Sequence, residues 1–366
     1  MRKFQFIFNI FAVLFALNVI AFSQTPEPQP TLPEPVINIT TEEIRLNISA
    51  VNRYGDSALG LTPDDVVISE NGRLHQATSV RQIPANVLFV LDVGNEISYA
   101  KRNKLTAETS RNLVNALQNE DSIAVMQYGD KVEILSDWTK DRATLNEVLG
   151  DKRLGLGRRS RFNLAMEQAI DFFNKTPLTN RHLVLITDGV DTLSNEQTKN
   201  EITKRLLSSD INVHVISYTT LQKQAINGMK TVTFGGAKRP NLPPGAGLPD
   251  YQQPPIGASV TINLDREMIN HRKKEAEKLS ISDDYLINLA KDTNGEFYLP
   301  ETPDEMKDKM SNLAKYIDSQ YVVTYTPNDP LEDAPDGEVR NIKVTSKKAG
   351  VYIQSSRKYV VAKSEQ

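Results

Sequence analysis

Two aspartates each follow a short, continuous apolar segment, and together they could hold a hard cation. Asp92 follows Val87–Leu91, and Asp188 comes one residue after Leu183–Ile186. Apolar runs of this length are typical of strands covered on both faces of a parallel sheet. Ligands of open α/β sheets bind outside the C-terminal ends of the strands, so we expect both carboxylates at one edge, where oxygen ligands suit a hard cation. Ser160, in a loop that opens a helix, could add a hydroxyl.

The elements that position these residues alternate between strand and helix. The apolar periodicity predicts further strands at 122–128, 132–135, 211–217 and 297–299. It predicts helices at 105–117, 164–173, 196–207, 283–293 and 303–317. Residues 266–279 are expected to form a charged, solvated helix. This order is typical of a doubly wound, mostly parallel α/β sheet.

Strand patterns also flank the α/β region on both sides. Ile44, Leu46 and Ile48 alternate with polar residues near the N-terminus, and Tyr321 and Val323 do so near the C-terminus. Neither end alone has enough strands for a stable double sheet. We therefore predict a small β-sandwich assembled from residues 36–84 and 319–366, with an α/β domain over 86–318 inserted in it. The alternative is two separate small β-units.

The first residues are typical of an export signal. Arg2 and Lys3 precede the apolar run Phe4–Phe22, and small residues before Gln24 favour cleavage after residue 23. Residues 1–23 are therefore predicted to be a signal peptide and 24–35 a proline-rich linker. The protein is then periplasmic or extracellular. The alternative is an uncleaved membrane anchor, since the run is nearly long enough to span a bilayer.

One long segment interrupts the α/β rhythm. Residues 221–280 are predicted to be an insertion, because they contain six prolines, from Pro240 to Pro255, and several glycines. The segment follows the strand predicted at 211–217, so it leaves the sheet at the edge that carries the aspartates. We expect it to cover or extend the binding face, and the alternative is a solvated loop.

Composition excludes several functions. The absence of cysteine excludes disulfides, thiolate metal sites and cysteine nucleophiles. The net charge of -3 offers no basic excess for nucleic acid. His182 and His214 fall in or beside predicted core strands, where packing is the expected role. Gly155-Leu156-Gly157 lacks the spacing of a phosphate-binding loop. We therefore expect no enzymatic activity and no small-molecule substrate.

The residues around the aspartates resemble those of a known family. Leu91-Asp92, Ser160 before Ala165-Met166, and Thr187-Asp188-Gly189 look like a von Willebrand factor type A (VWA) domain. The resemblance implies a metal-ion-dependent adhesion site with Asp-x-Ser-x-Ser after the first strand. It implies bound Mg²⁺ or Mn²⁺, with Ca²⁺ a poorer fit, and a protein partner that supplies a carboxylate to the metal.

More of the chain is similar to the acidobacterial-type VWA-related proteins. The leader segment 59–72 and the segments 321–327 and 357–359 resemble theirs. The resemblance covers about residues 37–361, apart from the proline-rich insertion.

The chain departs from the family pattern at the metal site. Asp92 and Asp188 match the acids of the pattern, and Ser160 stands where the family has threonine. Gly94 replaces the first serine and offers no ligand, while Glu96 replaces the second and adds a carboxylate that could fill the position a partner needs.

Three readings of the site follow. A working metal site would be formed by Asp92, Glu96, Ser160 and Asp188. An arginine-neutralised site would use Arg158, Arg159 or Arg161 in place of the metal, because the guanidinium fork matches carboxylate geometry. The third reading is that the site does neither, in which case the protein has a structural or assembly role at the cell envelope.

Overall fold

The computed structural model describes residues 43–94, 99–150, 154–155, 157–193, 196–228 and 261–363. The predicted signal peptide and linker lie outside the described residues. No helix within those ranges is long and apolar enough to cross a membrane.

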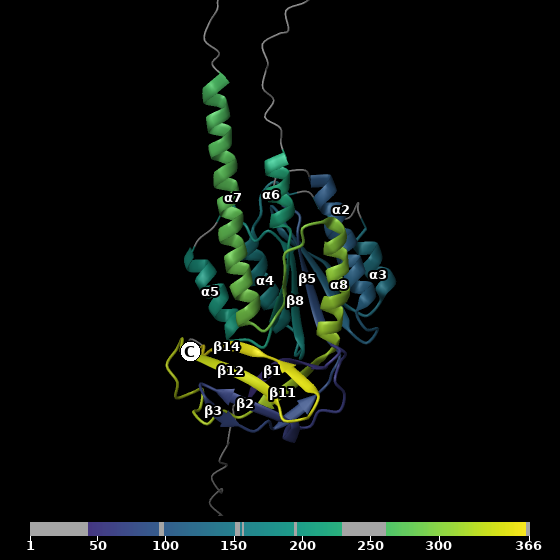
Figure 1. Ribbon diagram of the computed structural model, residues 1–366, viewed down its shortest axis with the longest axis vertical. Helices are drawn as coiled ribbons and strands as arrows, with labels where there is room; N and C mark the ends of the chain where they lie inside the picture. Colours follow the sequence, from purple (N-terminus) through teal and green to yellow (C-terminus); the bar gives the residue numbers. More distant parts are fainter. Residues whose placement is uncertain are drawn as a thin grey trace, which may run out of the picture. The chain divides into compact units, whose positions relative to one another are not determined.

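A mostly parallel sheet forms the centre of the fold (Figure 1). Its strands, in spatial order, are β10 (Phe297–Tyr298), β9 (Asn212–Ser217), β8 (Arg181–Thr187), β5 (Asn86–Asp92), β6 (Ser122–Tyr128) and β7 (Val132–Thr139). The pairs from β10 to β6 are parallel, and the edge strand β7 runs antiparallel to β6. The predicted α/β sheet is confirmed.

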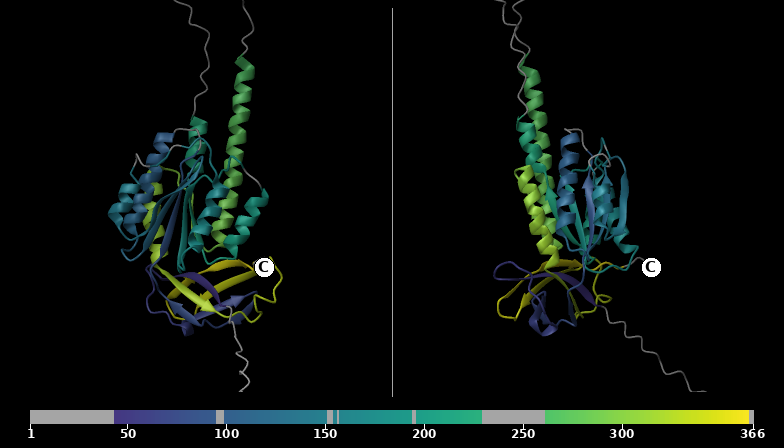
Figure 2. Two further views of the ribbon diagram at one scale, coloured as in Figure 1. Left: turned by 180° about the vertical axis from the view of Figure 1, so that it is seen from behind. Right: turned by 90° about the vertical axis from the view of Figure 1, so that its right-hand side faces the viewer.

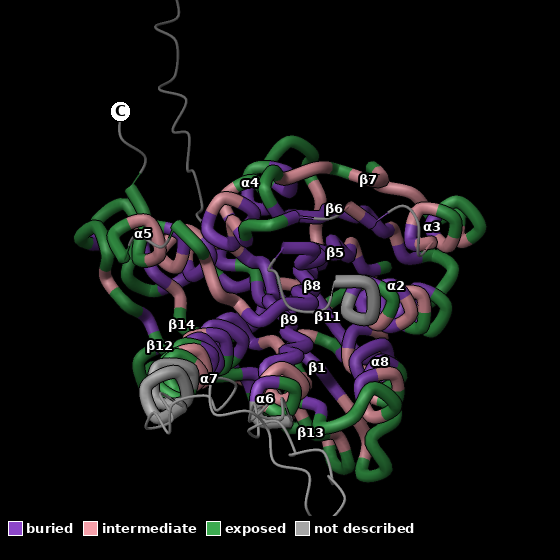
Figure 3. Tube along the Cα trace, turned by 90° about the horizontal axis from the view of Figure 1, so that it is seen from above, coloured by how far each residue is buried: buried purple, intermediate pink, exposed green. Residues whose placement is uncertain are grey.

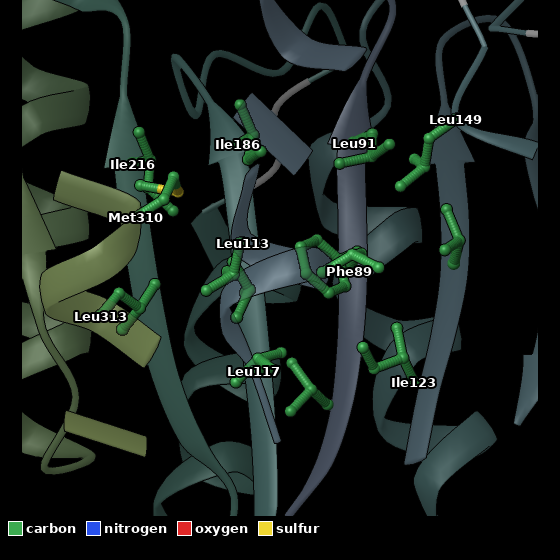
Figure 4. Close-up of a cluster of buried hydrophobic side chains, with 14 of the residues drawn as sticks. Phe89, Leu91, Leu113, Leu117, Ile123, Leu149, Ile186, Ile216, Met310 and Leu313 are labelled. Atoms are coloured by element: carbon green, nitrogen blue, oxygen red, sulfur yellow. The ribbon is translucent and has the colours of Figure 1, made fainter. Parts of the chain in front are cut away.

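Helices cover both faces of this sheet, and each face has its own apolar core (Figure 3). One face packs against α2 (Tyr99–Ala116), α3 (Arg142–Val148) and α8 (Pro303–Asp318). Figure 4 shows side chains of that core, where Phe89 and Leu91 of β5 meet helix residues such as Leu113. The other face packs against α4 (Phe162–Asn174), α5 (Glu196–Leu207) and α7 (Thr261–Asp292). Because both faces are covered, the strand residues are buried and the apolar runs are continuous.

The two ends of the chain combine in a β-sandwich. Among the described strands, one sheet has the order β13 (Val351–Gln354), β1 (Ile44–Asn52), β11 (Gln320–Tyr325), β4 (Ser79–Arg81). The other has the order β14 (Ser356–Val360), β12 (Val339–Ser346), β2 (Val66–Glu70), β3 (Arg73–His75), and the single-turn helix η1 (Pro63–Asp65) precedes β2. Each sheet contains strands from both ends of the chain, and their inner faces share one apolar core. The predicted sandwich with an inserted α/β domain is confirmed.

The sandwich contacts the α/β domain at the N-terminal ends of its parallel strands (Figures 1 and 2). Buried polar groups make this contact. The Arg357 guanidinium of β14 donates to Asn212 Oδ1 at the start of β9, and Asn47 of β1 donates to the Asp210 carbonyl. The C-terminal strand ends, where Asp92 and Asp188 lie, therefore face away from the sandwich.

The segment predicted as an insertion over 221–280 is helical at both of its ends. Helix α6 (Thr219–Gly228) occupies its start, and α7 runs without a break through the two helices predicted at 266–279 and 283–293. The reason is that no proline occurs between 221 and 239 or between 256 and 299, so nothing in the sequence removes the helical hydrogen bonds there. Residues 229–260, with the prolines, lie outside the described residues.

Candidate functional site

Asp92 is the last residue of β5 and is fully buried. Its Oδ1 accepts a hydrogen bond from the Gly94 amide at 2.9 Å, and its Oδ2 accepts one from the Thr187 hydroxyl at 3.3 Å. Both donors stabilise the ionised carboxylate. Asp92 therefore holds a carboxylate in a fixed position at the C-terminal edge of the sheet.

Asp188 follows β8 and is also fully buried. Its Oδ1 accepts from the Val190 amide at 2.9 Å, and its Oδ2 accepts from Gln222 Nε2 of α6 at 2.9 Å. Its carbonyl accepts from the Ser282 hydroxyl of α7 at 2.5 Å. The two helices that precede and follow residues 229–260 thus both bind Asp188 directly.

A tyrosine and a threonine link neighbouring strand ends to the aspartates. Since the Thr187 hydroxyl donates to Asp92, the Tyr128 hydroxyl donates to Thr187 Oγ1, 2.6 Å away. Burial raises the pKa of Tyr128 well above its usual value, and the charge of Asp92 raises it further. Tyr128 therefore stays protonated and serves as a hydrogen-bond donor beneath the site.

Ser160 enters the same site from the loop before α4. It is 2% exposed, and its Oγ has no hydrogen-bond partner of good geometry among the described residues. It is near enough to the Tyr128 hydroxyl to lower the pKa of that group slightly against the raising effect of burial. A buried hydroxyl with an unused lone pair is costly unless it is satisfied by water or a ligand.

Gly94, which replaces the first serine of the family pattern, is a glycine for a steric reason. A Cβ at this position would lie 2.2 Å from the carbonyl oxygen of Arg159. No side chain fits there unless the loop that carries Ser160 moves. The family serine is therefore absent here because the loop packs too closely on the end of β5 to admit a side chain.

The other predicted site residues are Glu96 and the three arginines. Glu96 lies outside the described residues. Arg158 and Arg159 are exposed, Arg161 is half-buried, and no ion pair joins them to Asp92 or Asp188 within the described part of the chain. Sequence reasoning thus placed Asp92, Asp188 and Ser160 together. One of its three readings put an arginine between the two aspartates, and the exposure of Arg158 and Arg159 does not favour that reading.

The residues present fit a small hard cation. Two buried carboxylates and a buried hydroxyl without a protein partner are oxygen donors of the kind that Mg²⁺ and Mn²⁺ prefer. Among the described residues no group of three or more histidines or acids could hold a metal. A cation here would therefore use Asp92, Asp188 and the hydroxyl of Ser160.

Three residues around the site escaped prediction. Tyr128 is the last residue of β6 and pairs in register with Asp92. Its position at the end of an apolar run could have indicated that it lies at the site. Gln222 and Ser282 carry no such signal, because only the folding of α6 and α7 against the sheet brings them to Asp188.

The sequence profile of the von Willebrand factor type A domain matches residues 87–190. This range contains Asp92, Ser160 and Asp188. The chain carries a VWA domain. No curated protein matches the sequence.

Solved structures with a similar course of the chain include other VWA proteins. One is described as a von Willebrand factor type A protein from Catenulispora acidiphila, with 10% identity over 88% of this chain and 74% of that one and a TM-score of 0.40. BatB from Bacteroides thetaiotaomicron has 15% identity over 64% and 98%, with a TM-score of 0.37. An aerotolerance-related membrane protein from Bacteroides fragilis has 17% identity over 63% and 98%, with a TM-score of 0.35. At these values nothing about the activity of this VWA protein follows from them.

Proposed function

We propose that this VWA protein is an exported, non-enzymatic binding module that captures a protein partner at the edge formed by Asp92 and Asp188. VWA domains commonly mediate protein interaction or adhesion. In this proposal Mg²⁺ or Mn²⁺ is held by Asp92, Asp188 and Ser160, and the partner supplies a carboxylate to it. The cation supplies positive charge to which that carboxylate binds.

The observation that supports the proposal most is the Ser160 hydroxyl. It is buried, and no hydrogen-bond partner of good geometry is found for its Oγ among the described residues, although it lies near the Tyr128 hydroxyl. A hydroxyl that served packing alone would be expected to donate to one of the nearby acceptors. Its remaining hydrogen-bonding capacity supports a ligand at this position.

Export is supported by the sequence alone. Arg2 and Lys3 followed by the apolar run Phe4–Phe22 are typical of a secretory signal. The proposal places the binding edge outside the cytoplasm, either free in the periplasm or extracellular space or tethered by an uncleaved N-terminal segment.

A structural role with a silent site is the second candidate, and one contact favours it. Gln222 Nε2 already donates to Asp188 Oδ2, and Gly94 provides no ligand. A cation would have to compete with the Gln222 amide for Asp188. In this case the sandwich, or another surface, mediates assembly at the cell envelope.

Calorimetric titration of Mg²⁺, Mn²⁺ and Ca²⁺ into the metal-free protein separates the two candidates. Asp92→Asn keeps the size of the side chain while removing its charge, and Asp284→Asn on the exposed face of α7 is the matched control. Binding that is lost in Asp92→Asn and kept in Asp284→Asn supports the metal-dependent module. If none of the three cations binds the unmodified protein, the metal-dependent proposal is wrong and the silent site stands.

A further inference from the structure

The loop that carries Ser160 is held rigidly from two sides. The Asp130 carboxylate, in the turn after β6, accepts the backbone amides of both Arg158 and Arg159, each at 3.1 Å. On the other side, the Ser160 carbonyl accepts both the amide of Thr192 at 2.9 Å and its hydroxyl at 2.8 Å. These bonds fix the backbone on either side of each arginine.

Backbone packing beneath the loop fixes it further. The Gly157 amide donates to the Val93 carbonyl at 3.0 Å. A Cβ on Gly157 would lie 2.7 Å from the Cα of Gly129, and a Cβ on Gly94 would meet the Arg159 carbonyl. Only glycine allows backbones to approach this closely. The loop therefore lies directly against the backbone that follows β5 and β6, next to Asp92.

The same loop presents positive charge outward. Arg158 and Arg159 are exposed, and within the described residues neither side chain forms an ion pair. The Asp130 carboxylate accepts hydrogen bonds from their backbone amides and not from their side chains. Asp92 and Asp188 are buried, whereas Asp130 is exposed with its two carboxylate oxygens bound to the loop amides. Arg158 and Arg159 are exposed with their guanidinium groups outside these bonds, so they can meet an approaching acidic molecule.

The helix that follows already has an acid at its N-terminus. Helix α4 begins at Phe162, and its N-cap Arg161 makes no side-chain capping bond among the described residues. Asp191 accepts the amide of Asn163 in the first turn at 2.7 Å. Since the N-terminus of an α-helix favours negative charge, Asp191 meets that preference. The attraction for an acidic partner therefore comes from the arginines.

We propose that Arg158 and Arg159 form a rigid cationic rim that selects an acidic segment of a partner protein. This inference rests on the proposed binding function of the same edge, and it adds the class of partner. The guanidinium groups bind the carboxylates of that segment by charge-assisted, bidentate hydrogen bonds. Because Asp130 and the glycine contacts hold the loop in place, less conformational entropy is lost on binding than with a free loop. The rim acts with or without a cation at Asp92.

The test uses a fluorescein-labelled octaglutamate peptide as the probe and a labelled octalysine peptide as the control of opposite charge. Anisotropy is measured on the full protein at about 50 mM NaCl, where exposed charges are weakly screened, once with EDTA and once with Mg²⁺. The rim variant is Arg158→Glu with Arg159→Glu. The control variant is Arg53→Glu with Arg81→Glu, two exposed arginines of the sandwich, which changes the net charge equally.

The unmodified protein is expected to bind octaglutamate and not octalysine, with EDTA present. The rim variant should weaken this binding by about tenfold or more, and the control by less than about twofold. Because EDTA removes any cation held at Asp92, binding measured in its presence reports on the rim and not on the metal site. Equal loss in the rim and control variants, or no binding of octaglutamate by the unmodified protein, would overturn the proposal even if a metal binds at Asp92.

Discussion

The Arg357 guanidinium, on the last strand of the sandwich, donates to Asn212 Oδ1 at the start of β9 at a distance of 3.1 Å. Arg357 is 2% exposed, and it also donates to the carbonyls of Thr293, Ser209 and Ile211. Burial lowers its pKa to about 10, so the group stays charged at neutral pH. One side chain from the sandwich thus satisfies the carbonyl groups that end α5 and α7.

Replacing Arg357 by Met should therefore destabilise the whole described fold. The substitution keeps an apolar stem but leaves several buried carbonyls without donors, and breaking a buried charged network of this kind costs about 3–5 kcal/mol. Urea unfolding at neutral pH measures the loss. The exposed Arg53→Met is the control and should change the free energy of unfolding by less than about 0.5 kcal/mol. Similar losses in the two variants would show that Arg357 does not hold the two parts together.

Much of this architecture follows from apolar periodicity. The alternation of Ile44, Leu46 and Ile48 predicted β1, and the continuous run Val87–Leu91 predicted the buried strand β5. Helix α3 went unpredicted because Arg142–Val148 is too short and too polar for a clear period. The two predicted helices after residue 266 are one helix, because no glycine or proline separates them.

The candidate site was less predictable than the fold. The strand-end rule brought Asp92 and Asp188 to one edge without any knowledge of contacts. The packing of Gly94 against the Arg159 carbonyl depends on how two loops meet, which no local pattern encodes. The hydrogen bond from Gln222 to Asp188 depends likewise on the docking of α6.

Restoring the family serine at Gly94 should harm the protein. Gly94→Ser would place its Cβ 2.2 Å from the Arg159 carbonyl, and overpacking against backbone costs about 1–3 kcal/mol. Thermal unfolding should show this loss, and the Mg²⁺ affinity should not increase, because the Ser160 loop must move to admit the side chain. Gly94→Ala is the matched variant and should lose as much, since the Cβ is the cause. A stable Gly94→Ser protein with tighter Mg²⁺ binding would contradict this account.

Two buried histidines, His182 and His214, should make the protein less stable in acid. The Glu296 amide donates to His214 Nδ1 at 3.1 Å, so His214 carries its proton on Nε2 and donates to His182 Nδ1 at 3.0 Å. His182 Nε2 then donates to Asn180 Oδ1 at 2.9 Å. Both rings are fully buried and neutral, as expected for a packing role. The ring of Tyr316 lies edge-on to that of His214.

Burial lowers the pKa of His182 to about 3, and burial together with His182 lowers the pKa of His214 well below its usual value. The unfolded chain therefore binds protons below about pH 6.5 that the folded chain does not. Stability should fall as pH decreases from about 6.5, by about 1.4 kcal/mol per pH unit for each histidine.

Urea unfolding between pH 7.5 and pH 4.5 tests this pair. The double variant His182→Asn with His214→Gln removes both titrations and should flatten the pH dependence relative to the unmodified protein. The exposed His271→Gln is the control and should leave the slope as it is. Burial raises the pKa of Asp318 to about 6, so this group makes the folded protein more stable as pH falls. The effect is the same in all variants and cancels when their pH dependences are compared. An unchanged slope in the double variant would mean that other groups set the acid sensitivity.

The last prediction concerns the support of α6, which provides Gln222 to the site. Asp283 of α7 is buried and accepts hydrogen bonds from Ser217 at 3.1 Å, from Thr219 at 2.7 Å and from Lys223 at 3.0 Å. Asp283→Ala leaves two buried hydroxyls and an ammonium group without their acceptor, a loss of about 2–3 kcal/mol. Because Thr219 and Lys223 lie in α6 and Ser217 lies just before it, the loss should concentrate there. Amide hydrogen exchange over 219–228 should accelerate more than exchange in β5.

The neighbouring Asp284 provides the control, since it lies on the same helix but is exposed. Asp284→Ala should leave exchange in α6 unchanged. If Asp283→Ala accelerated exchange equally throughout the central sheet, the carboxylate would support the whole domain and not α6 in particular. If it accelerated exchange in α6 alone, the position of Gln222 against Asp188 would depend on a charge carried by α7, and the helices on either side of residues 229–260 would act on the binding edge together.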